Sequence, residues 1–248
     1  MPRVYFDNAA TTPINDVALQ AFVDQARELG NPSSLHGYGR EVRKNLEEAR
    51  ERIASLVGCE ASEVIFTGSG TEANNLAIKG IFWKRRSEDP KRRVIVISTF
   101  LDPVHWLAEA EGAEVIEVPV TREGFINFEF LKSAIENRSD EIALVSIIHA
   151  NNEVGTIQPI SEVVKLAERY SIPVHTDAIQ SFGKIPLFAM TISAHKIGGP
   201  VGVGALILKR GVDVTPLLHG GGQERDIRSG TVNAAAIVAF ASAAQVAI

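Results

Sequence analysis

Hydrophobic residues recur along the chain in two alternating patterns. Short apolar runs that indicate buried strands lie at residues 64–67, 94–98, 115–119, 143–148, 174–176 and 203–208. Segments with helical spacing lie before and between them, at residues 16–29, 40–57, 72–83, 103–111, 128–137 and 160–170. The alternation predicts an α/β fold with a mostly parallel sheet and helices on both faces. Ligands of such sheets bind beyond the carboxyl ends of the strands, so we look for chemistry after each strand.

Composition and charge narrow the class of protein. The chain has 248 residues, of which 45% are hydrophobic and 22% charged, as in ordinary globular proteins. The formal net charge of -5 argues against nucleic acid as a partner. Residues 234–248 are apolar but too few to cross a bilayer, so we expect a buried helix there and no membrane association. The chain opens on no apolar signal segment, and Cys59 is its single cysteine, so we expect a cytoplasmic protein.

The first candidate site follows the first predicted strand. Residues 66–77 read FTGSGTEANNLA, in which a glycine-rich turn leads into a helix. Backbone N–H groups at a helix start, from Gly70 onward, together with the Thr71 hydroxyl can hold a phosphate group. The motif is neither a Walker loop nor a Gly-x-Gly-x-x-Gly turn. A purely structural turn with a threonine cap explains the same residues, so both interpretations stay open.

Two more polar residues follow predicted strands. Asp177 stands where a buried strand ends, and its carboxylate can cap a helix, bind a metal or pair with a protonated ring nitrogen. The six histidines are scattered, so we expect no metal site. Asn152, in the stretch HANNEVG, can donate a hydrogen bond to a phenolate-like oxygen or a carboxylate. The alternative for Asn152 is a plain asparagine-rich turn.

Lys196 is the candidate nucleophile. It ends the stretch TISAHK and precedes a glycine-rich loop, and we interpret its position as the end of a further strand. A neutral lysine amine attacks carbonyl groups, and desolvation or a cationic neighbour lowers its pKa toward that form. Ser193 and His195 beside it can both hold a phosphate, which favours a reactive lysine over an ordinary surface lysine. Thr231, at an expected helix start after residues 219–230, is a further candidate phosphate donor.

These residue types together match one cofactor. A phosphate cradle, an acid for a pyridine nitrogen, a hydrogen-bond donor and a lysine are what pyridoxal 5′-phosphate (PLP) requires, because its ring acts as an electron sink on a lysine imine. The sequence therefore predicts PLP as the cofactor and no metal.

Seven stretches in order resemble cysteine desulfurases of the NifS/IscS type, within the class V aminotransferase family. They cover nearly the whole chain and lie at residues 5–12, 30–36, 70–75, 151–155, 175–180, 193–196 and 220–231. The resemblance implies the large domain of a PLP-dependent transferase, a three-layer αβα unit over residues 16–248, after an N-terminal segment of residues 1–15. The family's small C-terminal domain is expected to be absent.

The resemblance also implies residue roles. Lys196 resembles the Schiff-base lysine and Asp177 the partner of the pyridinium nitrogen. Phosphate ligands are implied at Gly70, Thr71, Ser193 and His195, and residues near the ring oxygen and the substrate at Asn152 and Gln180. Thr231 resembles a residue that reaches the phosphate of the partner subunit, so a homodimer is implied. The implied reaction converts L-cysteine into L-alanine and leaves persulfide sulfur for an acceptor protein, in iron–sulfur cluster or thio-cofactor synthesis.

Three features depart from the family. The persulfide-forming cysteine and the substrate-binding arginine would lie past Ile248, and Cys59 is expected to be structural. After Ser98 and Thr99 the family's ring-stacking histidine is missing, and His105 is too far along to replace it. Residues 186–191 lack the expected connecting helix. Alternatives are therefore another class V activity, such as selenocysteine lyase or aminotransferase, or a non-catalytic PLP-binding scaffold.

Overall fold

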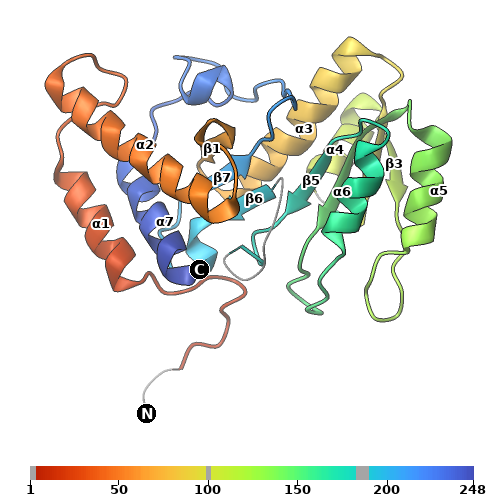
Figure 1. The fold of residues 1–248 in the computed structure, drawn as a ribbon, viewed down its shortest axis with the longest axis horizontal. Helices are drawn as coiled ribbons and strands as arrows, with labels where there is room; N and C mark the ends of the chain where they lie inside the picture. Colours follow the sequence, from red (N-terminus) through yellow and green to blue (C-terminus); the bar gives the residue numbers. More distant parts are fainter. Residues whose placement is uncertain (1–3, 99–101, 183–189) are drawn as a thin grey trace.

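A computed structural model describes residues 4–98, 102–182 and 190–248 of the chain. In this part seven strands form one sheet in the order β1-β7-β6-β5-β4-β2-β3 (Figure 1). β7 runs antiparallel to β1 and β6, and all other neighbours are parallel, which confirms the mostly parallel sheet. The strands are β1 Val64–Thr67, β2 Val94–Ile97, β3 Glu114–Glu117, β4 Ile142–Ile148, β5 Val174–Asp177, β6 Met190–Ser193 and β7 Gly204–Ile207.

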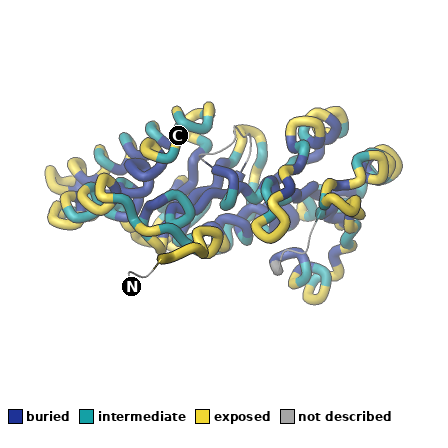
Figure 2. The backbone as a smooth tube through the Cα atoms, turned by 90° about the horizontal axis from the view of Figure 1, so that it is seen from below, coloured by how far each residue is buried: buried dark blue, intermediate teal, exposed yellow. Residues whose placement is uncertain are grey.

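Helices cover both faces of this sheet. They are α1 Asp16–Arg27, α2 Gly37–Val57, α3 Gly70–Glu88, α4 Asp102–Glu111, α5 Phe128–Arg138, α6 Ile160–Glu168 and α7 Ala234–Ala247, with short 3-10 turns η1 Ala61–Glu63, η2 Ala194–Lys196 and η3 Glu224–Asp226. The core clusters place α3 and α4 on one face and α2, α7, α5 and α6 on the other. The expected three layers are thus confirmed, and Figure 2 shows the buried strands between half-exposed helices.

The period of two along each strand produces this layering. Val64 and Phe66 of β1 pack with α2 and α7, whereas Ile65 between them packs against α3. In β2, Val94 and Val96 face α5 and α6, while the alternate residues face α3 and α4. Strands β1 and β2 therefore present apolar residues to both faces, as a sheet covered on both sides requires, whereas the central strand β5 carries the buried polar residues His175 and Thr176.

Several predicted boundaries need correction. The strand expected as buried at residues 115–119 is the edge strand β3, and its residues are partly or fully exposed because only β2 pairs with it. α2 and α3 begin earlier than predicted, since His36 and Ser69 cap them with their side chains. The cap of α3 is thus not Thr71. α7 is capped by Asn233, so Thr231 precedes the helix rather than starting it.

Two of the departures from the family fall partly or wholly outside the described residues. These are the stretch after Ser98, residues 99–101, and residues 186–189 before β6.

α7 confirms the expected buried helix, with its middle residues enclosed between α1 and α2. Within the described ranges no helix is both long and apolar enough to span a membrane.

The segment before α1 is fastened to the turn that carries Lys196. The Thr12 N–H donates to the His195 carbonyl at 2.9 Å, and the Asn15 N–H donates to the Gly198 carbonyl at 2.9 Å. The Asn15 side chain also caps α1 by accepting from the Ala18 N–H at 2.7 Å. These bonds bring residues 7–12 to the carboxyl edge of the sheet, where the candidate site lies.

Candidate active site

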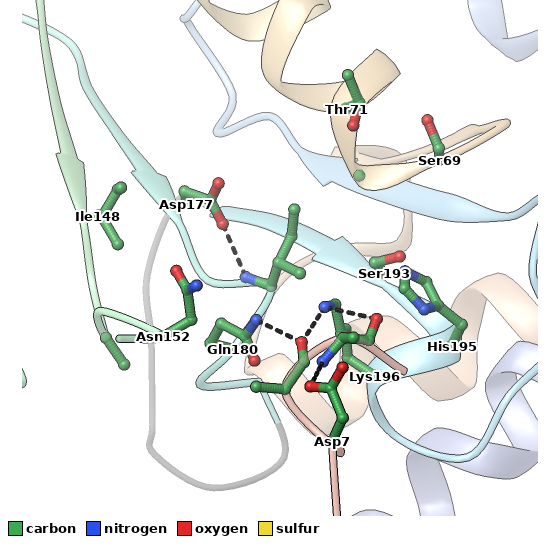
Figure 3. A pocket seen from close by; sticks show the side chains of 15 residues that line it. Asp7, Ser69, Thr71, Ile148, Asn152, Asp177, Gln180, Ser193, His195 and Lys196 are labelled. Atoms are coloured by element: carbon green, nitrogen blue, oxygen red, sulfur yellow. Dashed lines mark hydrogen bonds between the residues drawn. The ribbon is translucent and has the colours of Figure 1, made fainter. Parts of the chain in front are cut away.

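A cavity of about 600 Å³ lies at the carboxyl ends of the central parallel strands. Figure 3 shows its lining side chains, which come from separate segments and face a common space. Of the nine site residues predicted from the sequence, eight line this cavity: Gly70, Thr71, Asn152, Asp177, Gln180, Ser193, His195 and Lys196. The remaining lining residues are Asp7, Ala9, Ala10, Ser69, Ile148, Ala150 and Ile179.

The first wall is the start of α3. Ser69 caps the helix by accepting from the Glu72 N–H at 3.1 Å, and the N–H groups of Gly70 and Thr71 have no protein acceptor among the described residues. Free N–H groups at a helix start bind anions, aided by the helix dipole. Gly70 allows close packing, because a Cβ there would collide with the Ile179 side chain and lie 3.2 Å from the Ser193 Cβ.

Asp177 forms the second wall, at the end of β5. One carboxylate oxygen accepts from the Asn74 side-chain amide at 2.7 Å, and the other accepts from the Ile179 N–H at 3.0 Å. Burial raises the pKa of Asp177, while these two donors and the charge of Lys196 act in the opposite direction. A cationic group placed against this carboxylate would therefore favour its charged form.

Lys196 and its neighbours form the third wall. The Lys196 amine donates to the carbonyl oxygens of Ala9 and Ala10, in the segment before α1 (Figure 3). His195 lies within 3.2 Å of the Thr11 hydroxyl through its Nδ1 atom. Burial and the nearby Lys196 lower the pKa of His195, so the ring favours its neutral form. Ser193, at the end of β6, is buried and adds a hydroxyl to the same wall.

Asn152 and Gln180 line the cavity from the loops that follow β4 and β5. The Gln180 side-chain amide donates to the Ala9 carbonyl at 3.0 Å. Asn151 shapes the turn that holds Asn152, since its side chain accepts from the N–H groups of Glu153 and Val154 at 2.8 and 3.0 Å.

Three other candidates lie outside the cavity. Thr231 is exposed on the loop before α7 and does not line the cavity of its own chain. Cys59 lies just after α2, where burial and then the charges of Glu63 and Glu60 raise its pKa to about 11. His105 is on α4 and does not line the cavity. Cys59 thus has the inert character expected of a structural thiol.

Sequence reasoning missed two contributions to the cavity. The segment around Asp7, Ala9 and Ala10 matched a family motif but received no role, and it supplies the carbonyl oxygens that hold Lys196. Asn74 was also missed, although it lies four residues after Gly70 and so on the same side of α3. That spacing is the signal that could have linked Asn74 to the cavity.

These residues fit PLP. The cavity volume lies within the range of small-molecule sites, roughly 300–1,000 Å³. The free N–H groups of Gly70 and Thr71 suit a phosphate, the Asp177 carboxylate suits a cationic ring nitrogen, and the Lys196 amine suits an aldehyde. All of them face one cavity. In the parts of the chain that the structure describes, no three metal-ligating side chains come together.

Comparison with known proteins shows the family to which the chain belongs. The family model for aminotransferase class-V matches residues 4–247. The chain belongs to this family. Among curated class V relatives, an IscS-like cysteine desulfurase of Mycobacterium tuberculosis is 50% identical over 98% of this chain, and the cysteine desulfurase IscS of Dictyoglomus turgidum is 46% identical over 99%. The chain spans 65% and 64% of the lengths of these two proteins.

Two solved structures share the fold closely. A NifS-like protein superposes with a TM-score of 0.92 at 38% identity, covering 99% of this chain and 70% of that one. SspA, solved in complex with cysteine, superposes with a TM-score of 0.89 at 35% identity, covering 98% of this chain and 72% of that one. The fold and family expected from the sequence are therefore confirmed.

Proposed function

We propose that residues 16–248 form the cofactor-binding domain of a PLP-dependent cysteine desulfurase that acts on L-cysteine. The observation that carries the proposal is the convergence of Lys196, Asp177 and the start of α3 on one cavity. The names of the class V relatives, which are cysteine desulfurases, support the choice of reaction. SspA was solved with cysteine, which supports the choice of substrate.

Different residues of the cavity would bind different parts of the cofactor. PLP, when bound, supplies an electron sink for the carbanion chemistry of an amino acid. The N–H groups of Gly70 and Thr71, with Ser193 and His195, would hold its phosphate. Asp177, fixed by two donors, would keep the ring nitrogen protonated.

Lys196 would act twice. Its amine would serve first as the nucleophile toward the cofactor aldehyde and then as the base that takes up and returns the proton of the substrate. To do so the amine must leave the carbonyl oxygens of Ala9 and Ala10, to which it donates hydrogen bonds. Asn152 and Gln180 would orient the ring oxygen and the substrate from the loops that follow β4 and β5.

The proposal extends to partners and location. Thr231 is exposed and does not line the cavity of its own chain, which supports the expectation that it serves a second copy in a homodimer. The products would be L-alanine and persulfide sulfur, passed to an acceptor protein for iron–sulfur cluster or thio-cofactor synthesis. The raised pKa of Cys59 and its place outside the cavity support a persulfide carrier other than this thiol. We further propose that the protein acts in the cytoplasm.

The test is a titration of the purified chain with PLP. We expect a cofactor absorption band and, after borohydride reduction, a covalent mass increase on the peptide that contains Lys196. Lys196→Ala should lose both, whereas Lys209→Ala, which removes an exposed lysine paired with Glu168, should keep both. A wild-type chain that is colourless after unbound PLP has been removed by gel filtration would overturn the proposal.

Turnover separates the rival activities. Alanine and sulfide should form from L-cysteine in the presence of a thiol acceptor. Faster turnover of selenocysteine would favour a selenocysteine lyase, and amino transfer to oxo acids would favour an aminotransferase. PLP binding without turnover of any of them would favour a scaffold.

A further inference from the structure

The loop between β7 and α7 holds three consecutive residues in a strained conformation. Glu224, Arg225 and Asp226 have φ angles of 46°, 58° and 62°, in the left-handed region that favours glycine. Such strain persists only where surrounding contacts impose it, and it often marks a functional segment. We therefore look for the contacts that hold residues 218–233 (hereafter the η3 loop) in this conformation.

A buried ion pair fastens the η3 loop to β1. The Arg50 guanidinium, on α2, donates to both carboxylate oxygens of Glu224 at 2.7 and 2.8 Å. The side chains are 4% and 2% exposed. Glu224 also accepts from the Phe66 N–H at 2.7 Å, and Arg50 donates to the Val64 carbonyl at 2.6 Å. The pair thus joins the loop to the strand that leads directly into the start of α3.

A second ion pair joins the η3 loop to the start of α3 itself. Arg228 donates to the two carboxylate oxygens of Glu72 at 2.7 and 3.3 Å. Glu72 in turn accepts from the Gly68 N–H at 2.9 Å, in the turn just before the cap residue Ser69. Glu72 lies next to Thr71 in the first turn of α3, where the cavity has its free N–H groups.

The position of Glu72 creates an electrostatic conflict. A carboxylate in the first turn is favourable for the helix dipole, but it repels an anion bound at the same helix start. Arg228 removes the conflict because it neutralises Glu72, and the two side chains are only partly exposed, so water screens them incompletely. The same contact holds the Glu72 carboxylate against the Gly68 N–H and so fixes the turn.

We propose that Arg228 is a positioning residue for the anion site at the start of α3, held in place by the buried Arg50–Glu224 pair. Arg228 does not line the cavity and acts through Glu72 and the Gly68 turn. The contacts of the strained η3 loop with α2 and β1 hold the Arg228 guanidinium against Glu72. The inference rests on the proposed function insofar as the anion is the phosphate of PLP.

The test compares PLP with pyridoxal, which lacks the phosphate. Arg228→Gln should weaken PLP binding roughly tenfold and leave pyridoxal binding unchanged, because only the phosphate meets the uncompensated Glu72. The double variant Glu72→Gln/Arg228→Gln should recover most of the loss. Arg52→Gln, which breaks an exposed pair with Glu48 on α2, is the matched control and should change neither affinity.

Three results would overturn the inference. They are unchanged PLP affinity in Arg228→Gln, an equal loss for pyridoxal, and no recovery in the double variant. These outcomes differ from a failure of the proposed function, in which the wild-type chain itself would not bind PLP.

A second experiment tests the role of the buried pair. Glu224→Gln should speed tryptic cleavage after Arg225 and Arg228 and lower the PLP affinity without changing that for pyridoxal. If circular dichroism shows that Glu224→Gln is unfolded, the same experiment is done with Arg50→Lys, which keeps the positive charge. Faster cleavage with unchanged PLP affinity would show that the η3 loop does not support the anion site.

Discussion

Protonation of His175 is expected to destabilise the fold in mild acid. His175 lies in the middle of β5, fully enclosed, where its Nδ1 is 2.9 Å from the Ser146 hydroxyl on β4 and its Nε2 is 3.1 Å from the Thr191 hydroxyl on β6. A neutral ring satisfies both hydroxyl groups by donating to one and accepting from the other. Burial without a carboxylate partner lowers the pKa of His175 to about 4.

The magnitude follows from this shift. In the unfolded chain the imidazole takes up a proton near its ordinary pKa of 6.5, but in the native state it does so only near 4. Between these values the unfolded state binds more protons, so the unfolding free energy falls as the pH falls. At about 1.4 kcal/mol per pKa unit, the contribution of His175 amounts to about 3 kcal/mol, lost progressively from about pH 6.5 to pH 4.

The assay is urea unfolding at several pH values, read by circular dichroism. Other groups also titrate in this range, so the quantity of interest is the difference in slope between wild type and His175→Gln. The variant should be less stable at pH 7 but should lose about 3 kcal/mol less on acidification. Equal slopes for wild type and His175→Gln would refute the reasoning.

Three more predictions concern the cavity and the thiol. Gly204→Ala should cost about 2–3 kcal/mol and weaken PLP binding, because its Cβ would lie 2.7 Å from the Ser69 carbonyl carbon and 2.8 Å from the Gly70 nitrogen. Gly37→Ala, which meets open space, should be neutral in the same urea experiment, and equal stability of the two variants would contradict the prediction. Asp177→Asn should raise the stability of the cofactor-free chain at pH 7 by about 1 kcal/mol while abolishing the PLP band, because burial raises the pKa of the carboxyl and its charged form is costly. A lowered thermal midpoint would argue against this. Alkylation of Cys59 by iodoacetamide should keep accelerating up to about pH 11, and a plateau near pH 9 would contradict the raised pKa.

The fold was predictable where the apolar pattern is long and unambiguous. The β1 and β4 runs and the spacing of α2 and α5 identify the elements because burial on one or two faces leaves a direct trace in the sequence. β3 was wrongly expected to be buried, since Val115 and Ile116 are as apolar in sequence as the residues of a central strand. Its place at the edge depends on strand order, which a local pattern does not encode.

The candidate site was predictable where a side chain directly follows a strand. Asp177 and Lys196 follow this rule, and the chemistry of their neighbours singled them out. The segment before α1 does not follow it, because its contacts to residue 195 and Lys196 join positions more than 180 residues apart. The η3 loop is a similar case, since the Arg50–Glu224 pair spans 174 residues and no periodicity marks it.

The ionisable groups in the cavity and in the sheet beneath it share one physical cause. Burial raises the pKa of Asp177 and lowers the pKa values of His195 and His175, so each group is pushed toward its neutral form. In the sheet this neutrality has a structural use, because His175 bridges three strands. In the cavity, burial makes the charged form of Asp177 costly, the two donors and the charge of Lys196 offset part of this cost, and a cationic ligand would offset more of it. A cationic ligand that lowers the free-energy cost of the buried Asp177 carboxylate gains affinity by doing so. For this reason Asp177→Asn should raise the stability of the cofactor-free chain and at the same time abolish cofactor binding.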